Sequence, residues 1–167
     1  MKKVLIALCL FNISVSPATF RRWVIFPYEA QYRSDIILLA DAYGIDRAVF
    51  MGLIAHESMG FQKYATSPSG ARGLTQLMPS TAWFACPDLF TEGDIAGLYD
   101  TQKNLRCGAR YLSWQLHDFR GCLRCALSAY NAGPGATRRA GGRYPTLQAS
   151  LYVPAVLRYA TIYRGTL

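Results

Sequence analysis

The amino-acid sequence predicts a mainly α-helical domain. Apolar residues recur at helical spacing in several segments, and no run of six residues alternates convincingly between apolar and polar side chains. The 167 residues are enough for one domain with a substantial core and leave little room for a second. Since 51% of the residues are hydrophobic and only 17% are charged, the composition excludes a disordered chain.

The first half of the chain contains two well-marked helices. Residues 31–43 place their apolar side chains on one helical face, and Gly44 follows the last of them. Asp46 is a residue type that commonly begins helices, and the periodic residues 47–58 come directly after it. The turn-forming stretch "SPSGARG", residues 67–73, then predicts a loop.

Further helices are expected in the second half of the chain. A short one is expected to begin at Ser80 or Thr81, and "NAGPGA" at 131–136 is expected to break the helical pattern. Pro154 is expected to kink or start the last helix, and a short β-ribbon is compatible with residues 70–79 or 138–145. The three longer helices are expected at 101–117, 122–131 and 147–163.

The N-terminus has the layout of a secretory signal peptide. The basic start "MKK" precedes a mostly apolar run of 12 residues, and Ser16 and Ala18 occupy the small-residue positions of a cleavage site. We expect cleavage after Ala18, so that residues 1–18 are the signal peptide and residues 19–167 the mature domain. The alternative is an uncleaved N-terminal anchor, although the apolar run is short for a membrane span. Removal of two lysines lowers the formal charge from +8 to +6, which suits an acidic polymer such as cell wall or an anionic lipid. Outside the cytoplasm, this charge does not imply nucleic acid.

Four cysteines remain beyond the signal peptide. In an oxidising compartment their even number predicts disulfides. Cys122 and Cys125 are three residues apart and can bridge within one turn, which leaves Cys86 to pair with Cys107; buried free thiols are the alternative. A zinc site would need a second C-x-x-C or a His pair, and neither is present, so no metal or cofactor is expected.

The helix at 47–58 carries a carboxylate on its apolar face. Phe50, Leu53, Ile54 and Glu57 fall at positions i, i+3, i+4 and i+7, so Glu57 continues the buried stripe. An ionised carboxylate is costly there unless it is paired. Either Glu57 is solvated at the helix end, or it lines an apolar cleft in which burial raises its pKa and keeps it protonated as a general acid. Periodicity alone does not choose between these interpretations.

Five segments of the chain resemble, in order, the motifs of the soluble lytic transglycosylase family, whose lysozyme-like domains act on peptidoglycan. Each segment alone is weakly specific, whereas five in order across residues 30–165 are a strong signal. The resemblance implies a lysozyme-like α-helical fold with little or no β-structure, and it favours the cleft interpretation of Glu57. The segments are "ES" at 57–58, "GLTQLMP" at 73–79, "NLRCGARYL" at 104–112, "AYNAG" at 129–133 and "YV" at 152–153.

The chain departs from the family pattern at a few positions. Thr75 stands where Met is usual, and Pro154 stands where a basic residue is usual. One extra residue lies between the glutamate and the Ser-Pro turn, so either Thr66 or Ser67 takes the place of the family's substrate-binding serine. The spacing to the glycines that follow favours Ser67.

The resemblance implies that Glu57 is the catalytic residue. Most glycosidases use two carboxylates, but the other clustered acids of this chain lie at 88–100, outside the motifs, where a solvated loop is expected. Glu57 would protonate the glycosidic oxygen, the substrate's N-acetyl group would assist, and Glu57 would then take the proton of the sugar's 6-hydroxyl to close a 1,6-anhydro ring. A goose-type lysozyme relative would instead hydrolyse the bond, and a non-catalytic envelope module would keep only the fold.

The other motif residues imply a sugar-binding cleft. Gln76 offers an amide donor and acceptor, Met78 offers an apolar wall, and the Tyr130 phenol is expected to bond Glu57 or an acetamide. Tyr152 is expected to approach Glu57 from the last helix. Ordinary structural roles in the core or at helix ends are the alternatives. The substrate-binding residues that the resemblance implies are Ser67, Gln76, Met78, Tyr130, Asn131 and Tyr152.

The export signal and the family together imply a location and partners. The expected site of action is the periplasm or cell envelope, the expected partner is the peptidoglycan glycan strand, and we expect a monomer. Analogy within the family places a small enzyme of this kind beside a secretion or conjugation apparatus or a phage.

Overall fold

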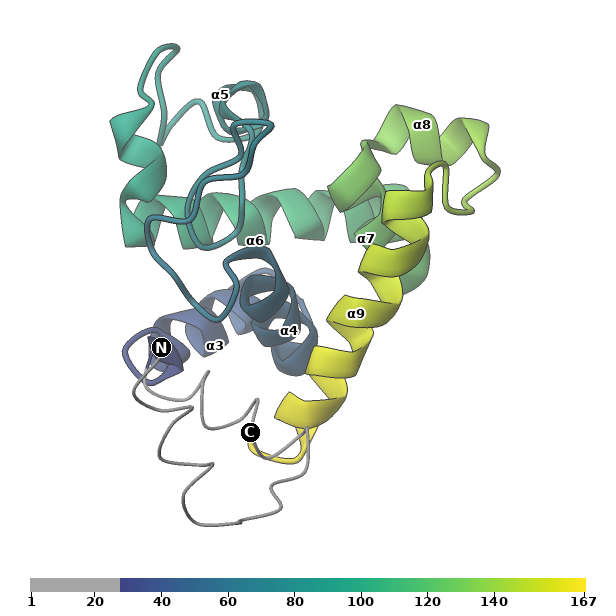
Figure 1. Cartoon of the computed structure of the whole chain (residues 1–167), viewed down its shortest axis with the longest axis horizontal. Coiled ribbons are helices and arrows are strands. Elements are labelled where there is room, and N and C mark those ends of the chain that lie inside the picture. The colour runs from purple at the N-terminus through teal and green to yellow at the C-terminus, as the bar shows by residue number, and fades with distance from the viewer. Residues whose placement is uncertain (1–27) are drawn as a thin grey trace, which may run out of the picture.

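Helices make up almost all of the regular structure in the computed structural model, which describes residues 28–167 (Figure 1). In this part of the chain, β-structure is limited to two isolated bridges that pair Arg72 with Thr66 and with Leu77. The mainly α-helical fold class is therefore confirmed. The elements are α3 (Arg33–Ala42), α4 (Arg47–Glu57), α5 (Pro79–Ala85), the 3-10 helix η1 (Ala96–Tyr99), α6 (Thr101–Asp118), α7 (Leu123–Ala132), α8 (Pro134–Arg139) and α9 (Leu147–Arg164).

The expected signal peptide, residues 1–18, lies outside the described residues. Within 28–167, none of the helices combines the length and the apolar character that crossing a membrane requires.

Short polar side chains begin three of the helices. Asp46, Asp100 and Thr146 each accept a hydrogen bond from the backbone N–H three residues further along, at the starts of α4, α6 and α9. Each bond satisfies an N–H that has no partner within the helix. The expected start of the helix after Asp46 is thus confirmed.

The structure corrects the expected start of one helix, at Pro79, and decides between the two expected roles of Pro154. α5 begins at Pro79 itself rather than at Ser80 or Thr81, because the fixed φ of proline suits the first helical position, where no N–H partner is needed. Pro154 lies inside α9 and does not start it. Its missing N–H removes one backbone hydrogen bond from that helix.

Helix α8 was not expected from the sequence. The glycine-rich stretch predicted a break after α7, and the break is a single residue: Gly133, with a φ of 86°, ends α7 and directly precedes α8. The alternative of a β-ribbon at 138–145 is wrong, because the end of α8 and the turns after it occupy this segment.

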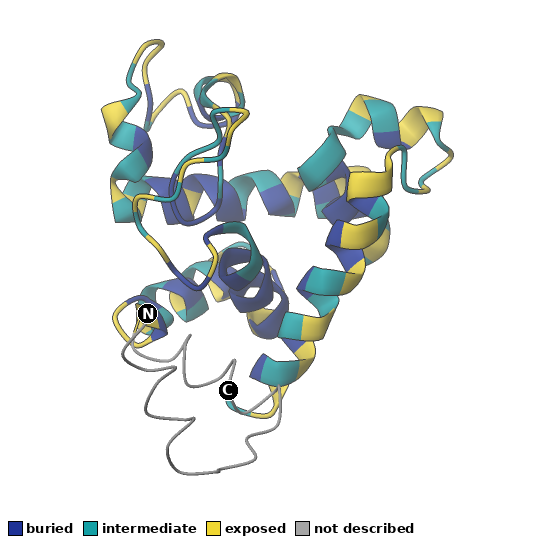
Figure 2. Cartoon of the chain, in the orientation of Figure 1, coloured by how far each residue is buried: buried dark blue, intermediate teal, exposed yellow. Residues whose placement is uncertain are grey.

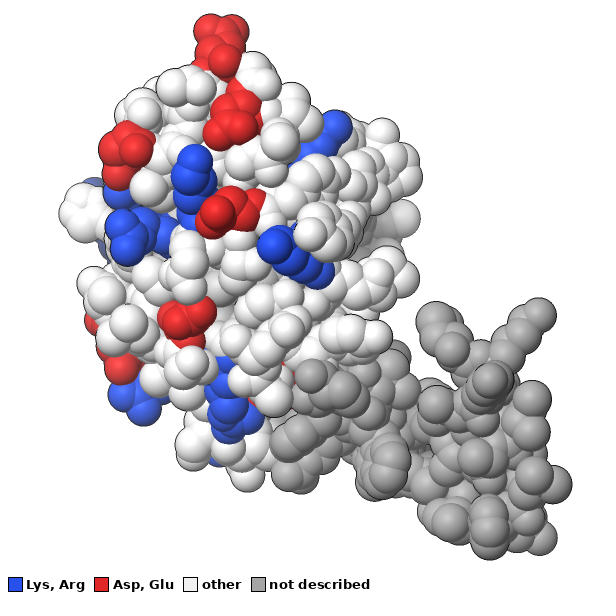
Figure 3. All heavy atoms as spheres, turned by 90° about the vertical axis from the view of Figure 1, so that its left-hand side faces the viewer, with Lys and Arg blue, Asp and Glu red and all other residues white. Residues whose placement is uncertain are grey.

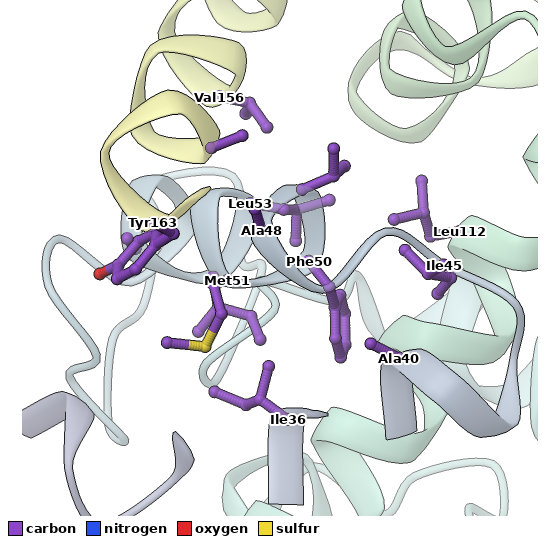
Figure 4. Packing of buried hydrophobic residues seen from close by; sticks show 14 of the residues in the cluster. Ile36, Ala40, Ile45, Ala48, Phe50, Met51, Leu53, Leu112, Val156 and Tyr163 are labelled. Carbon is purple, nitrogen blue, oxygen red and sulfur yellow. The ribbon is translucent and has the colours of Figure 1, made fainter. Parts of the chain in front are cut away.

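Helix α4 is the centre of the hydrophobic core and is buried on all sides (Figure 2). All eight residues from 48 to 55 are buried, because α3 and α9 pack against α4 and side chains of α6 complete the cluster. Figure 4 shows side chains from these neighbours around α4. The pattern of apolar residues predicted one buried stripe, but a helix that is apolar all round is an interior helix.

Helices α4 and α9 approach each other most closely at Gly52. A Cβ atom at this position would lie 2.7 Å from the backbone nitrogen of Ala160 and 2.8 Å from the carbonyl oxygen of Val156. Only glycine permits such an approach of two backbones. The contact brings the C-terminal end of α4 against α9.

A second, smaller cluster packs α5 and η1 against α6. It includes Leu77, Phe90 and Leu98, together with the disulfide between Cys86 and Cys107, which joins the end of α5 to α6. A second disulfide, Cys122–Cys125, lies at the first turn of α7. These are the two pairs hypothesised from the sequence.

Candidate active site

Glu57 is the last residue of the buried helix α4, and its side chain is half-buried. The phenol of Tyr152, on α9, donates a hydrogen bond of 2.7 Å to Oε1 of Glu57. His56 packs edge-on against the Tyr152 ring, with the ring centroids 5.1 Å apart. Glu57 and Tyr152 are 95 positions apart in the sequence, and the packing of α4 on α9 brings them together.

The surroundings of Glu57 raise its pKa from 4.5 to about 7. Burial is the main cause, because removal from water penalises the charged form, and the hydrogen bond from Tyr152 opposes part of the shift by stabilising the carboxylate. Near pH 7 both forms of the carboxyl group are populated, so it can donate a proton and accept one. The burial and the bond from Tyr152 favour a partly buried, structurally held carboxyl group over a solvated helix end.

A turn of unusual backbone conformation follows Glu57 directly. Met59, Gly60 and Phe61 have φ values of 51°, 91° and 67°, in a region that residues other than glycine seldom adopt. The buried Ser58 stabilises the turn: its Oγ donates to a carbonyl one helical turn back at 2.7 Å and accepts from the Phe61 N–H at 3.0 Å. The turn ends α4 at Glu57 and holds the carboxyl group at the helix terminus.

Gln76 holds the loop at 73–78 together. Its Nε2 donates to the carbonyl oxygens of Ala65 at 3.0 Å and Gly73 at 2.9 Å. Both N–H groups of the amide are thus used inside the protein, which leaves its carbonyl oxygen to accept a hydrogen bond from a ligand. Gln76 was expected to offer a donor and an acceptor to a substrate; here its donors are used inside the protein, and its role in binding stays a prediction.

Thr75 connects the same loop to α6 through Asn104. The backbone N–H and the hydroxyl of Thr75 donate to Oδ1 of Asn104 at 2.9 and 2.8 Å, and Nδ2 of Asn104 donates to the Leu98 carbonyl at 2.8 Å. All of these groups are buried, so the network holds the loop rigidly against the helix. Sequence reasoning assigned no role to Asn104, although this residue begins the motif segment at 104–112.

Tyr130 connects α7 to the loop at 73–78. Its phenol donates a hydrogen bond of 2.9 Å to the backbone carbonyl of Thr75. Glu57, one of the two partners expected from the sequence, does not accept this bond. Burial and the nearby charge of Glu57 raise the pKa of the Tyr130 phenol, which therefore remains protonated. Its ring lies against Tyr111, with the ring centroids 5.3 Å apart. Tyr130 thus joins α7 to the loop and lies near the acid.

The other three motif residues differ in exposure and in the contacts that they make. Met78, just before α5, is 38% exposed. Ser67 closes the tip of the turn at 67–71, where its Oγ accepts from the Ala71 N–H at 3.0 Å. Asn131 is half-buried in the last turn of α7, and Gly133 rather than Asn131 forms the C-cap.

The acidic residues of 88–100 have structural partners. Asp88 pairs with Arg110, Asp94 accepts a backbone N–H of η1 at 2.8 Å, and Asp100 begins α6. These contacts agree with the interpretation of this segment as a loop without catalytic acids. In residues 28–167, no group of three or more His, Cys, Asp or Glu side chains is arranged to hold a metal ion.

The family model and the proteins with similar sequences are all described as transglycosylases. The family model of the transglycosylase SLT domain matches residues 35–153. The soluble lytic murein transglycosylase of Salmonella typhimurium is 33% identical over 129 residues, which cover 66% of this chain and 20% of that protein. Membrane-bound lytic murein transglycosylase C of Haemophilus influenzae is 36% identical over 114 residues, which cover 60% and 30% of the two chains. The chain thus spans no more than a third of the length of these relatives.

Solved structures share the fold. An inactive glutamate-to-glutamine variant of the lytic transglycosylase Slt from Pseudomonas aeruginosa superposes with a TM-score of 0.72 at 30% identity, covering 83% of this chain and 24% of that one. The 70 kDa soluble lytic transglycosylase from Escherichia coli superposes with a TM-score of 0.72 at 28% identity, covering 80% and 24%. This chain therefore has the same fold class as the quarter of each solved structure on which it superposes.

Proposed function

Because the chain belongs to the transglycosylase SLT family, we propose that it is a peptidoglycan lytic transglycosylase that cleaves the β-1,4 bond between N-acetylmuramic acid and N-acetylglucosamine. The observation that carries the proposal is the half-buried Glu57, whose pKa of about 7 is set by burial and by the phenol of Tyr152. The inactivity of a glutamate-to-glutamine variant in a structural relative supports a glutamate as the essential group.

In the first step Glu57 acts as a general acid. Its protonated carboxyl group gives a proton to the glycosidic oxygen as the bond to the anomeric carbon breaks. The N-acetyl group of the muramic acid attacks that carbon from the opposite side, so no protein nucleophile is required. Glu57 is left as a carboxylate, which the hydrogen bond from Tyr152 stabilises.

In the second step Glu57 acts as a base. It takes the proton of the 6-hydroxyl of the same sugar, whose oxygen attacks the anomeric carbon and closes the 1,6-anhydro ring. The acetamido group is released, Glu57 regains its proton, and no water is consumed. The structural roles of Asp88, Asp94 and Asp100 support a mechanism with a single carboxylate.

The substrate is held by the residues around Glu57. Gln76 accepts a hydrogen bond through its carbonyl oxygen, and the exposed Met78 packs against a sugar face. Tyr130 and Asn131 line the side formed by α7, and Ser67 lies at the tip of the opposite turn. These assignments agree with the family motifs, and each is tested by the loss of binding in an alanine variant.

The protein acts outside the cytoplasm, in the periplasm or cell envelope. Two disulfides support an oxidising compartment. Removal of residues 1–18 as a signal peptide and local opening of the wall for a secretion, conjugation or phage apparatus are parts of the same proposal.

Digestion of purified peptidoglycan, followed by mass spectrometry of the products, tests this function. The wild-type protein is expected to release anhydromuropeptides, one water lighter than the products of hydrolysis. Glu57→Gln is expected to lower the rate by at least about a thousandfold, since the general acid and base are lost together. Glu92→Gln, the same change at an exposed loop acid, is the matched control and is expected to keep full activity.

Reducing-end products would identify a hydrolytic muramidase. The absence of products from wild-type protein that binds glycan strands would identify a non-catalytic module, and full activity of Glu57→Gln would exclude this residue as the acid.

A further inference from the structure

The imidazole ring of His56, in the last turn of α4, contacts two tyrosines of α9. Tyr152 and Tyr159 are seven residues apart, which is close to two helical turns, so they project from the same side of α9. The His56 ring packs edge-on against Tyr152, with the ring centroids 5.1 Å apart, and lies tilted against Tyr159, with the centroids 6.3 Å apart. Both distances are in the range of favourable aromatic pairs.

The hydrogen bond from Tyr152 to Glu57 depends on how the tyrosine ring is held. The phenol reaches across from α9 and donates to Oε1 of Glu57 at 2.7 Å. Its oxygen lies at the far end of the side chain, so a small rotation of the ring moves it by about an ångström and takes the bond beyond its usual length. An edge-on aromatic contact opposes that rotation, because its favourable geometry is directional. The residue next to the acid in sequence thus contacts the acid's hydrogen-bond partner.

His56 makes these contacts as a neutral ring. Burial lowers the pKa of its imidazole, and the positive charge of Arg158 lowers it further. Around pH 7 the ring is therefore uncharged. It acts on Glu57 through packing and not through a positive charge beside the carboxyl group.

We propose that His56 is a positioning residue, whose ring holds the phenol of Tyr152 on Oε1 of Glu57. His56 does not touch the reacting atoms and acts through Tyr152. A flat ring is required here, since an aliphatic side chain of similar volume fills the space without fixing the direction of the tyrosine ring. The inference deepens the proposed function and rests on it for the meaning of this contact in catalysis.

The pKa of Glu57, measured by carbon NMR of its carboxyl group, tests the proposal without turnover. His56→Leu keeps the bulk beside Glu57 and removes the flat ring. The bond from Tyr152 to the carboxylate is expected to weaken, so the pKa of Glu57 is expected to rise by about 0.5. His56→Phe restores a flat ring and is expected to keep the wild-type value. His117→Leu, the same change at an exposed histidine in the last turn of α6, is the control and is expected to change nothing.

Combining His56→Leu with Tyr152→Phe separates positioning from a general effect on packing. If His56 acts through Tyr152, the double variant is expected to have the same pKa at Glu57 as Tyr152→Phe alone. A shift in the double variant equal to the sum of the two single shifts would overturn the proposal. An unchanged or lowered pKa in His56→Leu would do the same, as would a raised pKa in His56→Phe.

The effect on catalysis is measured separately. In His56→Leu the alkaline limb of anhydromuropeptide release is expected to move upward by the same amount as the pKa of Glu57. Failure of the proposed function would be seen as absence of anhydro products from the wild-type protein, and it would leave the NMR comparison of the variants intact.

Discussion

The acid–base character of Glu57 comes from its place at the end of an interior helix. The preceding residues of α4 are buried all round, so the carboxyl group sits between the core and the surface. Tyr152 gives it one strong partner without a second charge, and therefore burial dominates the pKa. The same group can serve as acid and base because its pKa lies near neutral pH.

Activity is expected to fall as the pH rises above about 7. Since the pKa of Glu57 is raised to about 7, the protonated form needed for the first step is present below that pH and is lost above it. Tyr152→Phe removes a donor that stabilises the ionised form. Its loss is expected to raise the pKa of Glu57 further and to move the alkaline limb of the rate profile upward by about one pH unit.

The measurement is the rate of anhydromuropeptide release between pH 5 and 9. Tyr163→Phe, which removes a phenol elsewhere on α9, is expected to leave the alkaline limb in place. A limb that moves downward in Tyr152→Phe would contradict the assigned direction.

At the scale of helices, the contact between α4 and α9 places the active site. Gly52 allows the two backbones to approach, and five residues later the same helix delivers Glu57 to Tyr152. Gly108 does the same for α6 and the loop, since a Cβ there would lie within 2.6 Å of Thr75 side-chain atoms. At both glycines the space that a side chain would need is already filled, by the backbone of α9 at Gly52 and by the Thr75 side chain at Gly108.

Gly52→Ala is therefore expected to destabilise the protein by about 1–3 kcal/mol, because the added methyl group meets backbone atoms of α9 that have no room to move. It is also expected to lower activity by separating Glu57 from Tyr152. Urea denaturation measures the first effect and product release the second. Gly135→Ala, in the exposed part of α8, is the control and is expected to stabilise the protein by about 0.5 kcal/mol.

The two disulfides are expected to differ in accessibility and contribution. Cys86 and Cys107 are fully buried, whereas Cys122 is exposed. Mild reduction of the native protein, followed by alkylation and mass spectrometry, is expected to label Cys122 and Cys125 first. Labelling of all four cysteines at one rate would contradict this order.

Stability is expected to fall more when the buried bridge is removed. Replacing Cys86 and Cys107 by serine opens a loop of 21 residues and is expected to cost about 3 kcal/mol, against about 2 kcal/mol for the short bridge in α7.

At the scale of the whole molecule, charge is divided unevenly along the chain. Figure 3 shows acidic and basic side chains mixed on one face. Residues 119–167, which form α7, α8 and α9, contain seven arginines and no acidic residue. We name this segment the basic lobe. It carries Tyr152, the partner of Glu57, and its positive charge favours an anionic polymer.

Binding to peptidoglycan is expected to weaken with salt and with charge reversal in the basic lobe. Arg143→Glu is expected to lower cosedimentation with wall sacculi roughly five- to tenfold at low salt and much less at high salt, because screening removes the difference. Arg106→Glu makes the same change at an exposed position of α6 and is expected to have a smaller effect. Equal losses in the two variants would show that net charge, not the lobe, governs binding.

The sequence by itself determined the helical class, the cap at Asp46 and the position of Glu57 on its helix, and it suggested one pairing of the cysteines. These features depend on local chemistry: the spacing of apolar residues, the capping side chain, short-range geometry and compartment. The ordered motifs also identified the family, because five weak signals in one order are jointly specific.

Only the tertiary structure decided how these residues work. Neighbours that are far away in the sequence set the pKa of Glu57. Such neighbours also accept the hydrogen bonds of the Tyr130 phenol and the Gln76 amide. Helix α8 was likewise invisible in the pattern. The physical reason is that burial and hydrogen-bond partners are properties of packing, and packing is set by helices that meet only after the chain has folded.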